Sequence, residues 1–254
     1  MIQPLVKIDC QQHQFDGIEA IIFDKDGTLA DSEKFLRELG QKRARLLDAK
    51  IPGLGGPLLM AFGIEQDTLN PVGLMAVGSR YENEIAAAAY VAETGWGWLE
   101  AIAIAQAAFS EADEHFTAHA DTSPLFTGCL EQLQTFAEAG FKLAILSADT
   151  QAGVEDFIQR HNLSPYIQLA QGVTSAGFTK PDPQFFLQTC QQLGVPPSKA
   201  LMVGDAPGDI QMAKQAGAAG AIGICWKSSK TIHLEEADCA IAQLDELNLS
   251  ENFD

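Results

Sequence analysis

Basic residues are scarce in this 254-residue chain. Its 16 Lys and Arg stand against 34 Asp and Glu, which gives a formal net charge of −18 and a pI near 4.5. An acidic surplus of this size argues against a nucleic-acid partner or an anionic membrane surface. It does not exclude a phosphorylated ligand, because lysine side chains and a bound Mg²⁺ can outweigh the overall field inside a cleft.

Cysteines and long apolar runs are scarce as well. The chain has five scattered cysteines and no Cys-x-x-Cys spacing: Cys10, Cys129, Cys190, Cys225 and Cys239. This pattern predicts neither a zinc site nor a disulfide framework, and we interpret the five as buried reduced thiols of a cytoplasmic protein. No apolar run approaches the roughly 20 residues that a membrane helix needs. The first residues also lack the basic and then apolar pattern of a signal peptide.

What remains is the composition of a chain that buries a core. Hydrophobic residues make up 46% and charged residues 20% of the sequence, which is ordinary for a globular protein. The length leaves room for one large domain, or for a core domain with a smaller one. Because no internal repeat or low-complexity linker is present, the domain organisation has to come from the hydrophobic pattern.

The pattern alternates between strands and helices in most of the chain. Residues 20–23 form an apolar run bounded by charge, which is typical of a buried parallel strand. From residue 126 onward, the predicted helices are 131–139, 153–161, 183–193 and 210–215, and the predicted strands are 142–146, 167–170, 200–203 and 221–225. This alternation predicts an α/β fold with a Rossmann-like parallel sheet and helices on both faces.

A helical block interrupts this alternation. Residues 32–120 hold no convincing strand, and helices are predicted at 34–47, 82–92 and 98–119. We therefore predict a core domain from residues 1–30 and 121–254, with an all-helical domain inserted at 31–120. Within the core domain, residues 1–18 are interpreted as a short N-terminal extension, and the acidic residues 245–254 as a solvated tail.

Four short polar motifs stand out, and three of them directly follow strand-like runs. The motifs are Asp24-Lys25-Asp26-Gly27-Thr28-Leu29, Ile145-Leu146-Ser147-Ala148-Asp149, Thr179-Lys180-Pro181-Asp182-Pro183 and Gly204-Asp205-Ala206-Pro207-Gly208-Asp209. Because ligands bind at the carboxyl ends of strands in parallel sheets, we expect the motifs to form one site.

Each motif also has a plainer structural interpretation. Asp24 and Asp26, two residues apart, share a face in extended backbone and can meet one ligand, but an Asp-Gly turn after a strand is common. Ser147 can bind an anion or simply mark a helix entry, where Asp149 or Thr150 would cap equally well. Lys180 can be an ordinary surface lysine before a helix. Asp205 and Asp209 offer the oxygen ligands that Mg²⁺ prefers, although Asp209 could merely cap the next helix.

Together, in this order and spacing, the motifs resemble the haloacid dehalogenase-like hydrolase superfamily over residues 18–226. The resemblance is to its phosphatase branch, similar to phosphoglycolate phosphatases, with a helical cap after the first motif. It implies that Asp24 is the nucleophile and that Asp26 protonates the leaving alcohol and then deprotonates water. Dehalogenation is disfavoured, because a halide leaving group needs no proton from Asp26.

The same resemblance implies roles for the remaining motif residues. Ser147 would bind a phosphoryl oxygen, and Lys180 would neutralise the nucleophile and the transferring phosphoryl group. The cofactor would be Mg²⁺, held by Asp24, the backbone carbonyl of Asp26 and Asp205, with Asp209 beside them.

Two further residues are candidate substrate contacts. Lys25 departs from the family pattern, in which an apolar residue often stands between the two aspartates. We expect Lys25 to point away from its neighbours' shared face, where it would form a salt bridge, face the cleft entrance or meet substrate. Arg80, at a predicted helix start in the cap, could bind a carboxylate or a second phosphate, or form an Arg–Glu surface pair.

The resemblance implies a Mg²⁺-dependent phosphatase that hydrolyses a small phosphate monoester. Its partner would be a small phosphorylated metabolite, with no nucleic acid and no membrane involved. A sugar-phosphate phosphomutase can use the same paired aspartates, and a binding protein that keeps the fold without turnover is a third hypothesis. The sequence does not specify the oligomeric state.

Overall fold

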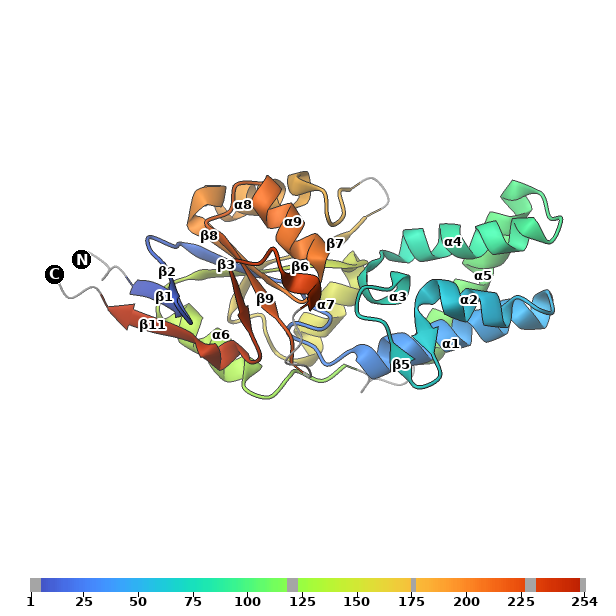
Figure 1. Ribbon diagram of the computed structural model, residues 1–254, viewed down its shortest axis with the longest axis horizontal. Coiled ribbons are helices and arrows are strands. Elements are labelled where there is room, and N and C mark those ends of the chain that lie inside the picture. Colours follow the sequence, from blue (N-terminus) through green and yellow to red (C-terminus); the bar gives the residue numbers. More distant parts are fainter. Residues whose placement is uncertain (1–5, 118–122, 175–176, 227–231, 252–254) are drawn as a thin grey trace. The chain divides into compact units, whose positions relative to one another are not determined.

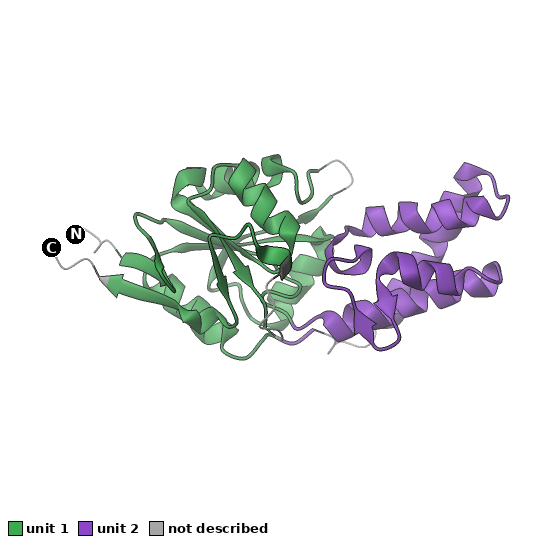
Figure 2. Ribbon diagram, in the orientation of Figure 1, with its two compact units in different colours: residues 1–30, 125–254 green, residues 31–124 purple. Residues whose placement is uncertain are grey.

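The computed structural model describes residues 6–117, 123–174, 177–226 and 232–251 (Figure 1). The chain divides into two compact units, residues 1–30 with 125–254 and residues 31–124 (Figure 2). The predicted boundary at residue 120 lies outside the described residues. The interpretation of the second unit as a cap stays a prediction.

Unit 1 is built on a six-stranded parallel sheet with the strand order β10-β9-β8-β3-β6-β7. The strands are β3 (Ala20–Phe23), β6 (Lys142–Thr150), β7 (Ile167–Val173), β8 (Ala200–Gly204), β9 (Gly220–Ile224) and β10 (Cys239–Ile241). β3 is fully buried and pairs with β6 on one side and β8 on the other. The predicted α/β fold with a parallel sheet is therefore confirmed.

Successive residues of the central strands supply two separate cores. Ile21 and Phe23 face α6 (Cys129–Glu138) and α7 (Gln151–Arg160), whereas Ala20 and Ile22 face α8 (Pro183–Leu193) and α9 (Pro207–Gln215). Figure 1 shows these two helix pairs on opposite sides of the sheet. Because both of its faces are covered, β3 is apolar at every position, and this explains the continuous hydrophobic run that marked it in the sequence.

Unit 2 is mainly helical and has its own hydrophobic core. Its elements are α1 (Glu33–Lys50), α2 (Gly55–Phe62), β4 (Ile64–Glu65), β5 (Thr68–Leu69), α3 (Leu74–Val77), α4 (Arg80–Glu93) and α5 (Trp98–Thr117). α2, α3 and the small hairpin were not predicted. α2 opens with Gly-Gly-Pro, a weak helix signal, and is stabilised by burial of Leu58 and Phe62. The last predicted residues of the third helix, 118 and 119, lie outside the described residues.

The two chain ends form a second sheet, which corrects two expectations. β1 (Val6–Cys10), β2 (His13–Phe15) and β11 (Leu247–Glu251) pair antiparallel in the order β11-β1-β2. Residues 6–15 are thus a hairpin, and the described part of the acidic C-terminal segment is not a solvated tail. Leu247 and Leu249 alternate with polar residues and pack on the core, a strand pattern that the nearby acidic residues obscured.

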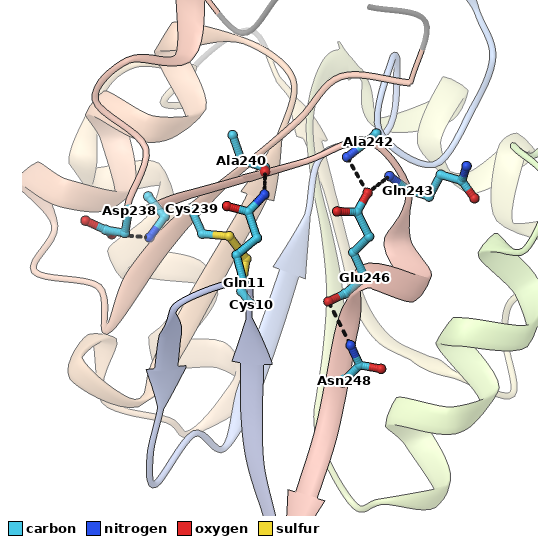
Figure 3. Close-up of a disulfide and its surroundings, with 10 residues drawn as sticks. Cys10, Gln11, Asp238, Cys239, Ala240, Ala242, Gln243, Glu246 and Asn248 are labelled. Carbon is cyan, nitrogen blue, oxygen red and sulfur yellow. Dashed lines mark hydrogen bonds between the residues drawn. A yellow bond between two sulfur atoms is a disulfide. The ribbon is translucent and has the colours of Figure 1, made fainter. Parts of the chain in front are cut away.

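A disulfide between Cys10 and Cys239 corrects a third expectation (Figure 3). It links β1 to β10, with a Cα–Cα distance of 6.4 Å. Beside it, the Gln11 side chain donates a hydrogen bond to the Ala240 carbonyl. The pair could not be found from spacing, because 229 residues separate the two cysteines. The other three cysteines are free, as expected.

Within the described residues, every helix is too short or too polar to span a membrane.

Candidate active site

The carboxyl ends of the central strands place the first and fourth motifs side by side. β3 ends at Phe23 and β8 at Gly204, so Asp24 and Asp205 follow directly from neighbouring strands. The Asp24 amide donates to the Val203 carbonyl at 2.9 Å, which continues the pairing into the motif. On the other side of β3, β6 continues through Ser147.

Lys180 connects the third motif to the other two. Its ammonium nitrogen lies 2.5 Å from Asp24 Oδ1 and 2.6 Å from Asp209 Oδ1. The side chain is buried and comes from the loop before α8, whose first turn is capped by Asp182. Asp182 accepts from the Gln184 amide at 2.9 Å, which fixes the end of the loop that carries Lys180.

Three carboxylates form a compact acidic group. Asp24, Asp205 and Asp209 each offer an oxygen, and these oxygens lie within 4.8 Å of one another. Thr28 adds a hydroxyl donor 3.4 Å from Asp205 Oδ1. Three carboxylate oxygens at this spacing fit a hard cation such as Mg²⁺, which prefers oxygen ligands.

Two glycines make this close approach possible. Gly27 has φ of +80°, and a Cβ there would collide with the Asp205 carboxylate. A Cβ at Gly204 would collide with the carboxylate of Asp209. Both positions therefore exclude a side chain so that the acidic groups can converge.

Burial and charge perturb the site's titration. Desolvation raises the pKa of Asp24, opposed by the positive charge of Lys180. Desolvation also raises the pKa of Asp205 well above its ordinary value, and the negative charges of Asp24 and Asp209 raise it further. Burial lowers the pKa of Lys180, but Asp209 and Asp24 more than offset this and raise it. Three carboxylates share the one ammonium of Lys180, so their fully charged forms exceed the positive charge available, and a bound cation would favour those charged forms.

Asp209 serves the helix terminus and also lies in the acidic group, while its role as a metal ligand stays a prediction. Its Oδ2 accepts from the Ala206 amide at 3.2 Å at the start of α9, so it does serve that helix terminus. Its Oδ1 faces Lys180, so the same fully buried side chain also belongs to the acidic group.

Ser147 is buried in β6, and its Oγ accepts from the Asp149 amide at 3.1 Å. It is not the helix cap, because Thr150 fills that position and accepts from the Gly153 amide at 3.1 Å. The structure thus places Ser147 within β6, which continues to Thr150 and does not end before Ser147 as the sequence predicted, and the phosphoryl contact of Ser147 stays a prediction.

Lys25 does not point away from its neighbours, contrary to expectation. Its ammonium lies 3.0 Å from Asp26 Oδ2 and 2.7 Å from Asp149 Oδ2. The expectation assumed extended backbone, but β3 ends at Phe23 and the chain turns, with the Lys25 carbonyl accepting from the Leu29 amide at 3.0 Å. Of the alternatives, the structure shows the salt bridge.

Asp26 lies beside the acidic group but is not one of its three carboxylates. Desolvation raises its pKa, with Lys25 opposing this and the carboxylates of Asp149 and Asp24 adding to it. Its role as acid and base, and the role of its backbone carbonyl as a metal ligand, stay predictions.

Arg80 lies in unit 2 at the start of α4. It forms ion pairs with Glu84 and Asp113, each at 2.8 Å. The Arg–Glu pair that the sequence suggested is therefore present, and a contact with substrate stays a prediction.

Sequence reasoning missed three side chains that hold the site's loops. Asp149, which binds Lys25, was considered only as a helix cap, although it lies within the second motif. Trp226 donates from its indole to the Thr28 carbonyl at 3.0 Å, and its position just after β9 was an available signal. A ring nitrogen of His233 lies 3.2 Å from the Asp205 carbonyl, and nothing in the sequence marked it.

The chain resembles known proteins along most of its length. A family model described as haloacid dehalogenase-like hydrolase matches residues 18–217. The probable phosphatase IndB of Dickeya dadantii is 32% identical over 114 residues, which cover 45% of this chain and 49% of that protein. A phosphoglycolate phosphatase of Rhodospirillum rubrum is 28% identical and covers 78% of this chain and 76% of its own. The chain spans less than half the length of the first curated relatives that it matches.

Solved structures share the fold at low identity. A predicted phosphoglycolate phosphatase from Haemophilus somnus has a TM-score of 0.66 at 21% identity, covering 90% of this chain and 95% of its own. A β-phosphoglucomutase from Clostridium difficile has the same TM-score of 0.66 at 17% identity, covering 91% and 93%. The family match spans the parallel sheet from β3 to β8 and all four motifs, and on this basis the chain belongs to the haloacid dehalogenase-like hydrolase family.

Proposed function

We propose that this protein is a Mg²⁺-dependent phosphatase that hydrolyses a small phosphate monoester through an aspartyl phosphate on Asp24. The observation that carries the proposal is the position of the Lys180 ammonium, held between Asp24 and Asp209 inside a group of three converging carboxylates. Phosphoryl transfer requires a positioned nucleophile and positive charge around the phosphoryl group. Lys180 positions Asp24 and supplies one positive charge, and the three carboxylates could hold a cation that would supply the rest.

The reaction takes place in two steps on the residues of unit 1. In the first, an Asp24 oxygen forms a bond to phosphorus while the bond to the substrate oxygen breaks, and Asp26 gives that oxygen its proton. In the second, Asp26 takes a proton from water, whose oxygen attacks phosphorus and releases Asp24 and inorganic phosphate. Burial raises the pKa of Asp26, which favours the protonated form that the first step needs.

The surrounding residues hold the phosphoryl group in place. Lys180 neutralises charge on the phosphoryl oxygens, and the Ser147 hydroxyl donates a hydrogen bond to one of them. Mg²⁺ would be held by Asp24, Asp205 and the Asp26 carbonyl, with Asp209 beside them, and would supply positive charge to the transferring phosphoryl group.

Unit 2 is assigned as the specificity cap, with Arg80 as a substrate contact. Several curated relatives are named phosphoglycolate phosphatases, so a small phosphorylated carboxylic acid is the first substrate to test. The net charge of −18 disfavours a nucleic-acid substrate, and we propose neither a nucleic-acid nor a membrane partner.

Location is a separate matter. A cytoplasmic location stays a prediction. The Cys10–Cys239 disulfide argues against it, because disulfides are more typical of oxidising compartments.

Phosphate release from a broad panel of phosphate monoesters with Mg²⁺, with Asp24→Asn in parallel, tests the proposal. We expect release by wild type and none by the variant, which keeps the fold because the side chains are nearly isosteric. Turnover by Asp24→Asn near the wild-type rate would remove Asp24 as nucleophile. Wild-type silence on the whole panel would favour the phosphomutase hypothesis, if a bisphosphate-primed isomerisation assay is positive, or the binding-protein hypothesis if that assay is negative.

A further inference from the structure

Lys25 is held between two carboxylates at the edge of the candidate active site. Its ammonium lies 3.0 Å from Asp26 Oδ2 and 2.7 Å from Asp149 Oδ2, and 6% of the side chain is exposed. The ammonium also lies 5.7 Å from the centre of the Phe157 ring, on α7. A lysine has many rotamers in solution, so these three contacts restrict it to one of them.

The two oxygens of Asp26 have different surroundings. Oδ2 is paired with Lys25, whereas Oδ1 is buried and has no hydrogen-bond partner among the described residues. A buried carboxylate oxygen without a partner is unusual in a folded protein and indicates a place where a further group binds.

We propose that Lys25 is a positioning residue for Asp26: it anchors Oδ2, so that Oδ1 stays free to exchange the proton with the leaving oxygen and with water. The proposal rests on the proposed function, in which Asp26 is the acid and base. It assigns Lys25 a contact with Asp26 and none with substrate.

The anchor is itself fixed from both sides. The Lys25 carbonyl accepts from the amides of Leu29 and Ala30 at 3.0 and 2.9 Å, which holds its backbone in the turn after β3. On the far side, Asp149 Oδ1 accepts from the Thr150 amide at 2.6 Å at the end of β6. Lys25 therefore links Asp26 to the end of the neighbouring strand, and an apolar side chain at position 25 could not do this.

Substrates whose leaving groups differ in their need for protonation can show whether Lys25 acts by positioning the acid Asp26. Phenyl phosphate and p-nitrophenyl phosphate have similar shapes, but phenolate is a much poorer leaving group and depends more on protonation. In full-length protein with Mg²⁺, we expect Lys25→Met to lower kcat/KM for phenyl phosphate by about 10–100-fold and for p-nitrophenyl phosphate by a few-fold at most. Asp26→Asn should show the same selectivity with a larger loss.

Two controls give the result its meaning. Lys199→Met removes an ammonium that is half exposed and paired with Glu19, and it should leave both rates unchanged. Equal losses on the two esters in Lys25→Met would overturn the proposal, since a substrate contact or a general loss of structure affects both alike. Unchanged rates on both esters would also overturn it.

A crystal structure of Lys25→Met tests the anchor without any turnover. We expect the Asp26 carboxylate to occupy more than one rotamer in the variant and a single rotamer in wild type. An Asp26 carboxylate that keeps its wild-type place without Lys25 would overturn the proposal. If wild type hydrolyses neither aryl ester nor any member of the monoester panel, the proposed phosphatase function fails, and the rotamer result alone decides the role of Lys25.

Discussion

Replacing Lys180 by Met tests how the acidic group is stabilised. The ammonium of Lys180 is shared by Asp24 and Asp209, at 2.5 and 2.6 Å, and all three side chains are buried. Breaking a buried ion pair by removing one partner costs about 3–5 kcal/mol, because a charge is left uncompensated in a low-dielectric environment. Without a divalent cation, we therefore expect Lys180→Met to lower the free energy of unfolding of unit 1 by about this amount.

Urea unfolding in EDTA measures this loss. Trp226 is the one tryptophan of unit 1, and the other two, Trp96 and Trp98, are partly exposed in unit 2. In a Trp96→Phe, Trp98→Phe background, fluorescence therefore reports unit 1 alone. A loss of 3–5 kcal/mol corresponds to a fall of about 1–2 M in the urea midpoint.

Magnesium sharpens the test. A cation that binds the folded protein stabilises it by mass action and supplies the charge that Lys180→Met removes, so the deficit should shrink as Mg²⁺ is added. A deficit below about 1 kcal/mol in EDTA would refute the role of the ion pairs, because exposed pairs such as Lys199–Glu19 are worth only that much. A deficit that Mg²⁺ leaves unchanged would refute the acidic group as the metal site.

Three further changes test neighbouring parts of the structure. In EDTA, the raised pKa of Asp205 means that the folded protein binds a proton at this carboxyl more tightly than the unfolded chain does. The free energy of unfolding should therefore fall as the pH rises from about 4 through the raised pKa. In urea titrations, Asp205→Asn should flatten that slope. Asp205→Asn should also weaken the Mg²⁺ dependence of turnover sharply, and an unchanged metal titration would remove it from the site. Gly27→Ala should weaken Mg²⁺ binding measured by calorimetry, because its Cβ would displace the Asp205 carboxylate, and an unaltered affinity would contradict this packing. Reducing the Cys10–Cys239 disulfide, which spans 229 residues, should lower the free energy of unfolding by at most about 5 kcal/mol in the chain-entropy description. A reductant should lower the urea midpoint of wild type but not of Cys10→Ser, and equal responses would contradict the pairing.

The sequence predicted the parts of the fold that repeat a simple pattern. Alternating strands and helices gave the parallel sheet, and the helix predicted at 183–193 is observed with the same bounds and ends at Gly194, which has the left-handed conformation. The terminal sheet was missed, because its strands are short and β1 pairs with β11 across nearly the whole chain. Strand pairing of that kind depends on long-range contacts, which local pattern cannot supply.

The candidate site shows the same division. The position of Asp24 and Asp205 followed from strand ends, which local sequence marks well. The direction of Lys25 did not, because it depends on a turn that begins at the residue after Phe23 and on Asp149, which lies 124 residues away. The alternation of side chains in extended backbone predicted the wrong direction for the Lys25 side chain, because the rule was applied beyond the end of β3.

The distribution of charge in the site explains why Asp205 is the carboxylate most strongly perturbed toward protonation. Lys180 is shared by Asp24 and Asp209, and Lys25 by Asp26 and Asp149. Asp205 forms no ion pair with any described residue and lies beside two other acids, and desolvation and their negative charges raise its pKa well above the ordinary value. A carboxylate in this position is stable in its charged form only with a further cation, because a hydroxyl such as that of Thr28 offers no positive charge. We therefore expect a divalent ion bound by the acidic group to act most strongly on Asp205.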